Sequence, residues 1–323
     1  MRADKLLCAK QGCLEKSGHT DDVQRPSNIG AVLRETTELL AALPQASPYL
    51  EARLLLSAAT GRTHTEFLAR PETELSATDL AHFDRLLRRR LAGEPIAYIR
   101  GRQAFWTLDL RVTPATLIPR PETELLVELA LARLPAKAPL RVLDAGSGSG
   151  AIAAALASER PAWTLLATEH NSEAARLADT NLRTYRLGNA HVIRCDWLQP
   201  IARNSLDAIV GNPPYLSATD PHLGQGDLPW EPRPALAAGP DGLDAIRTLC
   251  AQATSRLRPT GFIALEHGYD QGPAARAIFE WHGFEDILTH RDLGDRERAT
   301  TGRLPPPGPH STLISSKVAA SSR

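Results

Sequence analysis

The segment Asp207–Leu216 reads DAIVGNPPYL and places several chemically capable groups directly after an apolar run. Residues 208–210 have the pattern of a buried strand. Two consecutive prolines cannot donate hydrogen bonds to a β ladder, so this strand must end at the NPPY stretch. The end of the strand therefore presents the amide of Asn212, a rigid Pro213-Pro214 step and the ring of Tyr215.

These groups suit the methylation of a planar nitrogen. A primary amide or exocyclic amine is conjugated and nucleophilically weak, so its nitrogen must be held in line with the methyl–sulfur bond of a donor. The Asn212 side-chain oxygen can accept one N–H and the Pro213 carbonyl the other, while the Tyr215 ring stacks on the planar group. Such positioning is worth roughly 7 to 11 kcal/mol of barrier, and acceptors aimed at the charge developing on nitrogen add to it. An ordinary strand-ending turn is the simpler alternative.

A second candidate site is the glycine-rich segment 144–150, DAGSGSG, which lies between a predicted strand and a predicted helix. Glycines there let the backbone turn sharply and let a ligand approach the main chain closely. Glu169 ends the following predicted strand, where a carboxylate can accept hydrogen bonds from both hydroxyls of a ribose. The loop and this acid together predict a nucleoside-containing cofactor.

Two cofactors fit the loop. Gly146-x-Gly148-x-x-Ala151 satisfies the loose dinucleotide pattern, which keeps an NAD oxidoreductase open. S-Adenosylmethionine carries no phosphate and has a cationic sulfonium. The acids Asp144 and Glu169 around the loop suit such a cation better than a pyrophosphate.

Strands and helices alternate from residue 140 onward, and this alternation predicts how the two candidate sites meet. Predicted strands cover 141–144, 164–168, 190–194, 206–210 and 261–266, and predicted helices cover 125–134, 151–158, 172–186 and 242–257. This order indicates a mostly parallel sheet covered on both faces. Ligands bind beyond the carboxyl ends of such strands. The strand count places the NPPY stretch at the end of the fourth strand, beside the glycine loop.

The residues before the sheet are predicted to be helical. We expect a helix capped by Ser27 and covering 29–43, a second over 49–58 that ends near Gly61, and a third over 76–93. Residues 105–112 alternate as one strand of a β pair. Residues 1–27 and 305–323 are expected to be a disordered extension and a disordered tail.

Composition narrows the class of protein. The chain has 323 residues, with 37 basic and 37 acidic side chains, so its net charge of zero argues against direct nucleic-acid binding. Its cysteines, Cys8, Cys13, Cys195 and Cys250, form no C-x-x-C pair, which predicts reduced thiols and no metal. No apolar run approaches the roughly 18 to 20 residues of a membrane span. We expect a cytoplasmic monomer.

Several of these segments together resemble the release factor glutamine methyltransferase family, of the HemK or PrmC type. NPPY alone is shared with DNA adenine methyltransferases, but its combination with two further segments is specific to this family. The likeness extends over about residues 28–304. The segments that carry it are IPRPETE (118–124), RVLDAGSGSGAIAAALA (141–157), NPPY (212–215), EPRPAL (231–236), GFIALEHGYDQG (261–272) and RDLGDRERATTGR (291–303).

The resemblance implies an α/β fold, a Rossmann-like seven-stranded sheet of the S-adenosylmethionine-dependent methyltransferases. It implies a helical substrate-recognition domain at 28–93, a β-hairpin linker at 94–116 and the methyltransferase domain at 117–304. The implied reaction methylates N5 of the glutamine in the Gly-Gly-Gln motif of class I peptide chain release factors, which act in translation termination. The donor is S-adenosyl-L-methionine, which leaves as S-adenosylhomocysteine.

Site residues follow from the resemblance position by position. Substrate binding and catalysis fall on Asn212, Pro213, Pro214 and Tyr215. Cofactor binding falls on Ala145, Gly146, Ser147, Gly148, Ser149, Gly150, Glu169, Asp196, Trp197 and Asn212. The family often has Asp where this chain has Glu169, which keeps the carboxylate on a side chain one methylene longer.

Other assignments stay open at this point. Arg120 and Glu122 either line the pocket or are helix-start charges. Phe105 and Trp106 either flank the adenosine or pack the hairpin, and His267 is expected to be structural. A ribosomal-protein glutamine methyltransferase shares NPPY, although IPRPETE speaks against it. A DNA amino-methyltransferase would need a base-reading domain and a positive face, which the balanced charge does not favour.

Overall fold

The computed structural model describes residues 27–43 and 47–306. The chain forms two compact units that divide between Arg100 and Gly101. We call them the helical unit and the sheet unit. The predicted extension at 1–27 lies outside the described residues except for Ser27, and the predicted tail at 305–323 does so beyond residue 306.

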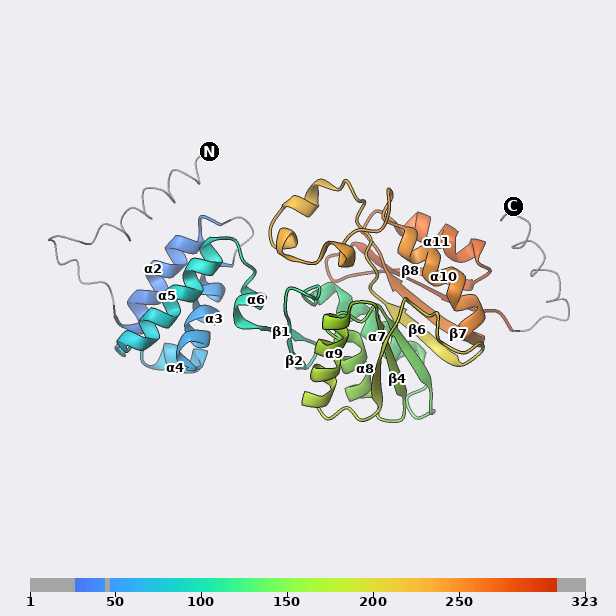
Figure 1. Cartoon of the computed structure of the whole chain (residues 1–323), viewed down its shortest axis with the longest axis horizontal. Helices are drawn as coiled ribbons and strands as arrows, with labels where there is room; N and C mark the ends of the chain where they lie inside the picture. The colour runs from blue at the N-terminus through green and yellow to red at the C-terminus, as the bar shows by residue number, and fades with distance from the viewer. Residues whose placement is uncertain (1–26, 44–46, 307–323) are drawn as a thin grey trace. The chain divides into compact units, whose positions relative to one another are not determined.

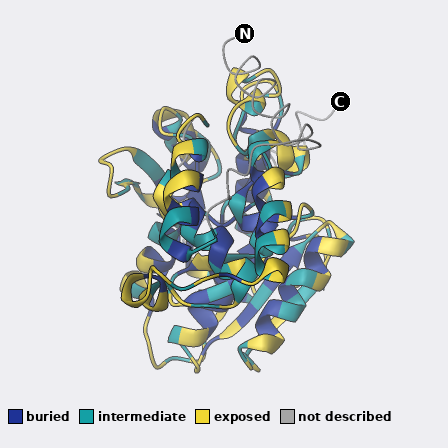
Figure 2. Cartoon of the chain, turned by 90° about the vertical axis from the view of Figure 1, so that its left-hand side faces the viewer, coloured by how far each residue is buried: buried dark blue, intermediate teal, exposed yellow. Residues whose placement is uncertain are grey.

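The helical unit is built from amphipathic helices whose apolar faces form one core. Its elements are α2 (Ile29–Leu40), α3 (Pro48–Thr60), α4 (His64–Ala69), α5 (Ala77–Leu91) and α6 (Ile96–Arg100). The core includes Leu40, Leu55 and Phe83, all almost fully buried. In Figure 2 the helices show buried residues on their packed side and exposed residues on the other.

Capping residues explain where these helices begin and end. Ser76 caps α5 by accepting from the Asp79 N–H, and Gly61 ends α3 in the left-handed conformation, so the predicted start of one helix and end of the other are confirmed. The predicted cap of α2 was wrong by one residue. Asn28 is the cap, because its side chain accepts from the Ala31 N–H at 2.9 Å.

A short hairpin opens the sheet unit. β1 (Arg102–Phe105) pairs antiparallel with β2 (Leu108–Arg111). The predicted β pair is confirmed, but the strand predicted over 105–112 began too early, because the chain turns at Trp106, whose φ is 56°, and β2 begins at Leu108. Phe105 is buried in the core of the sheet unit, and the Trp106 indole N–H donates to Glu159 at 2.8 Å. Both aromatic residues thus pack the hairpin onto the sheet unit.

The sheet has seven strands in the order β5-β4-β3-β6-β7-β9-β8. The neighbours from β5 to β7 are parallel, while β9 pairs antiparallel with both β7 and β8. This confirms the predicted mostly parallel methyltransferase-type sheet. The strands are β3 (Arg141–Ala145), β4 (Thr164–Glu169), β5 (Ala190–Arg194), β6 (Leu206–Gly211), β7 (Leu257–Glu266), β8 (Glu285–Arg291) and β9 (Glu297–Arg303).

Helices cover both faces of this sheet (Figure 1). One layer is α7 (Glu124–Arg133), α8 (Ala151–Glu159) and α9 (Ser172–Thr184), and the other is α10 (Asp244–Arg256) and α11 (Gly272–Trp281). Neighbouring residues of a strand face opposite layers. Accordingly, Val142 belongs to the core under α7 and α8, and Leu143 to the core under α10 and α11.

Short 3-10 helices shape the loops at the carboxyl edge of the sheet. η1 (Pro121–Thr123) leads into α7, and η2 (Pro221–Gly224), η3 (Leu228–Trp230) and η4 (Arg233–Ala235) lie between β6 and α10. Within the described ranges, no helix is long and apolar enough to cross a membrane. The same ranges contain no group of three or more His, Cys, Asp or Glu side chains arranged to hold a metal ion.

Candidate active site

The two predicted site loops lie next to each other because their strands pair. β3 and β6 are parallel neighbours, with Asp144 opposite Val210. The glycine loop follows β3, and the NPPY stretch follows β6. Gly211 makes the approach possible, since a Cβ added there would lie 2.9 Å from the Ala145 carbonyl oxygen. The strand count therefore placed the two loops correctly.

The glycine loop needs its glycines for conformation as well as for space. Gly146, Gly148 and Gly150 all have positive φ, which L-residues rarely adopt. The Gly146 and Ser147 N–H groups both donate to the Thr168 carbonyl at 2.9 Å, which ties the loop to β4. The hydroxyl of Ser147 is buried and has no hydrogen-bond partner among the described residues.

Glu169 reaches back from the end of β4 to the glycine loop. One carboxylate oxygen accepts from the Gly148 N–H at 2.9 Å, and the other accepts from the Asn171 N–H at 2.7 Å. A carboxylate has about four acceptor positions. Glu169 thus organises two backbone segments and still has acceptor capacity for hydroxyl groups of a ligand.

Asp196 and Trp197 follow β5, the next strand of the sheet. The ring of Trp197 lies against the glycine loop, because a Cβ added to Gly146 would meet its Cζ3 atom at 2.9 Å. Asp196 is exposed and accepts from the Gln199 side chain at 2.8 Å. The predicted cofactor residues therefore come from the ends of β3, β4 and β5, apart from Asn212, which follows β6.

The NPPY stretch is connected to buried side chains that the sequence did not single out. The Asn212 side-chain nitrogen donates to Thr123 Oγ1 at 3.0 Å, and Thr123 Oγ1 donates to Glu266 at 2.7 Å. The Tyr215 hydroxyl donates to the other oxygen of Glu266 over 3.4 Å. Thr123 belongs to IPRPETE, and Glu266 ends β7, so three distant segments converge on Asn212.

Burial perturbs the acids of this region. Desolvation raises the pKa of Glu266 to about 7, although Thr123, Arg298 and Tyr215 oppose the shift. Desolvation also raises the pKa of Tyr215, so its phenol stays neutral. Desolvation raises the pKa of Asp144 to about 7, and the nearby charge of Glu169 adds to this.

A second buried acid joins the segments on either side of the NPPY stretch. Glu231 accepts from the Ile118 N–H at 3.1 Å and forms an ion pair with Arg120. Desolvation raises the Glu231 pKa, and the charge of Arg120 opposes this. IPRPETE and EPRPAL are thereby bonded to each other. Arg120 serves this contact, while Glu122 is exposed.

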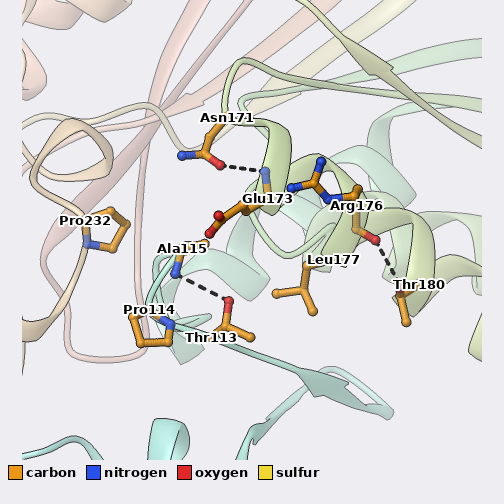
Figure 3. A pocket seen from close by; sticks show the side chains of 9 residues that line it. All are labelled: Thr113, Pro114, Ala115, Asn171, Glu173, Arg176, Leu177, Thr180 and Pro232. Atoms are coloured by element: carbon orange, nitrogen blue, oxygen red, sulfur yellow. Dashed lines mark hydrogen bonds between the residues drawn. The ribbon is translucent and has the colours of Figure 1, made fainter.

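A pocket of about 640 Å³ lies at the start of α9 (Figure 3). Its lining comes from the loop after β2, the start of α9 and the EPRPAL segment. Asn171, which bonds to Glu169, is one of its residues, but no NPPY residue is. The pocket is linked to the predicted cofactor residues through Asn171, but none of them lines it. The lining residues are Thr113, Pro114, Ala115, Asn171, Glu173, Arg176, Leu177, Thr180 and Pro232.

His267 has a structural environment, as its sequence position indicated. It is fully buried, with Nε2 bonded to the Thr300 hydroxyl at 2.9 Å and Nδ1 to the Gly268 carbonyl at 2.8 Å. Burial lowers its pKa, which keeps the ring neutral. Thr123, Glu231 and Glu266 were missed as site residues. The only signal for them was their place inside the family-like segments.

Two family models match the chain. The PrmC N-terminal domain matches residues 31–101, and the methyltransferase small domain matches residues 122–225. The chain is 46% identical to a release factor glutamine methyltransferase of Escherichia coli (strain K12), over 84% of this chain and 97% of that protein. It is 49% identical to the Pseudomonas aeruginosa protein of the same name, over 80% of this chain and 93% of that one.

Among solved structures, a methyltransferase from Pyrococcus furiosus aligns with a TM-score of 0.48 and 17% identity. The alignment covers 69% of this chain and 99% of that one. The family assignment therefore rests on the sequence relatives and the family models.

Proposed function

The chain belongs to the family of release factor glutamine methyltransferases, and on that premise we propose that it methylates N5 of a glutamine side chain in class I peptide chain release factors. The glutamine of the Gly-Gly-Gln motif is the proposed acceptor, and S-adenosylmethionine the proposed donor. The observation that carries the proposal is the Asn212 amide. Its nitrogen is occupied by Thr123 at 3.0 Å, which leaves its oxygen to receive a planar N–H.

The residues at the ends of β3, β4 and β5 fit S-adenosylmethionine. The buried Ser147 hydroxyl lacks a partner among the described residues, as does one oxygen of the fully buried Asp144. The carboxylate of Glu169 makes the region favourable for a cation, and a bound cation would also favour the ionised form of Asp144. Glu169 has unused acceptor positions for ribose hydroxyls, and Trp197 offers an aromatic face. When bound, S-adenosylmethionine supplies an electrophilic methyl carbon on a cationic sulfur.

The chain's own residues orient the glutamine amide in this proposal. One N–H of the substrate donates to Asn212 Oδ1. The other donates to the Pro213 carbonyl, which accepts none of the hydrogen bonds found among the described residues. Holding both protons fixes the amide plane, and positioning of this kind contributes roughly 7 to 11 kcal/mol. The acceptors also stabilise positive charge that develops on the nitrogen.

No residue needs to remove a proton before the methyl transfer. Asn212 Oδ1 and the Pro213 carbonyl hold the two N–H groups while the nitrogen attacks. The N–H becomes acidic only after the new bond forms, and the proton then passes to solvent. Tyr215 stays a neutral phenol because burial raises its pKa, so its ring stacks on the substrate without adding charge.

Mass spectrometry of a co-expressed class I release factor tests the proposal. We expect one added methyl group on the glutamine of its Gly-Gly-Gln motif, and none when Asn212→Ala is co-expressed instead. A release factor without the added methyl group in the presence of the folded wild-type enzyme would refute the proposal. Calorimetry with NAD and with S-adenosylmethionine separates the oxidoreductase alternative, because only the methyl donor should bind.

A further inference from the structure

Two buried side chains outside the NPPY stretch are connected to Asn212. Glu266 is 1% exposed and Thr123 is 5% exposed. They form a continuous hydrogen-bond chain with Asn212. The Asn212 side-chain nitrogen donates to Thr123 at 3.0 Å, and the Thr123 hydroxyl donates to Glu266 at 2.7 Å. We propose that Thr123 and Glu266 are positioning residues that determine which atom of the Asn212 amide faces the substrate. This inference rests on the proposed function.

The donor-to-acceptor direction of this hydrogen-bond chain follows from the chemistry of Glu266. A carboxylate has no proton to donate, so Glu266 can only accept. The Thr123 hydroxyl must then donate its single proton to Glu266, so toward Asn212 its oxygen can only accept. The group that Asn212 turns toward Thr123 is therefore its NH₂, and its carbonyl oxygen points the other way.

This direction matters because the two ends of a side-chain amide have nearly the same shape. Rotating the Asn212 amide by half a turn costs little in packing, but it would present N–H donors to the N–H donors of the glutamine. Two donors facing each other repel, and the acceptor needed for the developing positive charge would be lost. A carboxylate two hydrogen bonds away prevents this by making only one orientation compatible with the chain.

The charges around Glu266 are compatible with a switch between its two protonation states. Arg298 of β9 and the Tyr215 hydroxyl favour the carboxylate, whereas burial and the charge of Glu122 disfavour it, and the resulting pKa is about 7. Above this pH Glu266 is ionised, and the hydrogen-bond chain can run only from Asn212 through Thr123 to Glu266. Below it, the protonated acid can also donate to Thr123, so both orientations of Asn212 become accessible.

A matched pair of variants at Thr123 tests this hydrogen-bond chain. Thr123→Val keeps the shape and removes the hydroxyl, so we expect kcat for release-factor methylation to fall by about tenfold, the effect of losing one hydrogen bond that orients a reacting group. Affinity for S-adenosylhomocysteine should stay at the wild-type value, because the hydrogen bonds of the Thr123 side chain go to Asn212 and Glu266 and not to the glycine loop or Glu169. Thr123→Ser keeps the hydroxyl and should restore most of kcat.

Glu266→Gln tests the direction-setting acid. The variant should fold, because it removes a buried charge without changing the shape. The side-chain amide that this change introduces can either donate to Thr123 or accept from it. Both orientations of Asn212 then become accessible, so kcat at pH 8 should fall several-fold. Wild-type kcat should fall as the pH is lowered through about 7, and this acid limb should be reduced or absent in Glu266→Gln. Because Asp144 also has a pKa of about 7, the limb should be smaller rather than lost if that acid contributes, and an acid limb identical in the variant and the wild type would refute the role of Glu266.

The double variant Thr123→Val/Glu266→Gln separates a connected chain from two independent contributions. If Glu266 acts through Thr123, the double variant should be no slower than Thr123→Val alone, because the connection is already broken. If the kcat loss of the double variant equals the product of the two single losses, Glu266 does not act through Thr123. If the wild-type enzyme does not methylate the release factor, the proposed function is refuted. If the wild type is active and Thr123→Val is equally active, only the positioning role of Thr123 and Glu266 is refuted.

Discussion

Replacing Glu169 by glutamine should weaken the binding of S-adenosylmethionine while leaving the methyl-transfer step intact. In the structure both carboxylate oxygens accept backbone N–H groups, from Gly148 at 2.9 Å and from Asn171 at 2.7 Å. Glutamine has nearly the same shape but only one oxygen. Its NH₂ group must therefore face one of the two N–H donors, which breaks that hydrogen bond and puts two donors in contact.

The size of the effect follows from the contacts proposed between Glu169 and the ribose hydroxyls. A hydrogen bond to a charged group contributes about 1.5 to 3 kcal/mol. Glu169→Gln, with one oxygen and no charge, would lose one such bond to the ribose outright and the charge assistance of the other. Glu169 is only partly buried, so solvent reduces the electrostatic part. We therefore expect a loss of about 3 kcal/mol, which corresponds to roughly a 100-fold increase in the Kd for the methyl donor.

Isothermal titration calorimetry with S-adenosylmethionine and with S-adenosylhomocysteine measures this effect. Glu280→Gln is the matched control, because Glu280 is an exposed acid of α11 on a different helix layer, and its Kd values should equal those of the wild type. At saturating donor, kcat of Glu169→Gln should recover to near the wild-type value. A normal Kd with a lowered kcat would refute the assignment of Glu169 to the cofactor and place it in the methyl-transfer step.

Three further expectations concern the same loops. Asn212→Ala should keep the calorimetric Kd for S-adenosylmethionine near normal and remove most turnover; a weakened Kd with normal turnover per bound donor would contradict its substrate role. Gly146→Ala should raise that Kd, because φ is +73° and the new Cβ meets the Trp197 ring at 2.9 Å; unchanged binding would show that this ring does not border the cofactor. The pKa of Asp144 is raised to about 7 in the folded protein. The folded state therefore keeps a proton that the unfolded state releases from about pH 4 upward. The free energy of unfolding of the wild type should accordingly fall between about pH 4 and 7, by up to about 4 kcal/mol. Asp144→Asn should flatten this decline in thermal melts, and an equal slope in both proteins would count against the buried acid as its cause.

Local patterns were sufficient to predict most of the sheet unit. The alternation of apolar strands with helices identifies β3, β4, β5 and β6 to within a residue or two, and parallel pairing then brings their carboxyl ends together. The same reasoning predicted the β pair of the hairpin but misplaced the start of its strand. A turn at Trp106 requires a positive φ from a bulky residue, and no local propensity predicts that. The helices α4, α6 and α11 were not predicted either.

The supporting residues of the site could not be predicted from local patterns. Asn212 and Thr123 are 89 residues apart in the sequence, and Thr123 and Glu266 are 143 apart. Glu266 reads as the polar end of an apolar strand, and Thr123 as part of a helix start. They meet because the sheet pairs β6 with β7 and the Thr123 hydroxyl of η1 bonds to both Asn212 and Glu266, and no periodicity in the sequence encodes this neighbourhood.

Two buried acids, Glu231 and Glu266, bond the family-like segments to one another. Glu231 of EPRPAL bonds the Ile118 N–H and Arg120, which holds IPRPETE in place. Thr123 of IPRPETE can therefore bridge Asn212 to Glu266 in a fixed geometry. Each buried carboxylate is costly to desolvate, and both pKa values are raised accordingly. Such a cost makes sense at a site that must hold a weakly nucleophilic amide by its two protons, because an acceptor that could rotate or retreat would not impose the direction that the reaction requires.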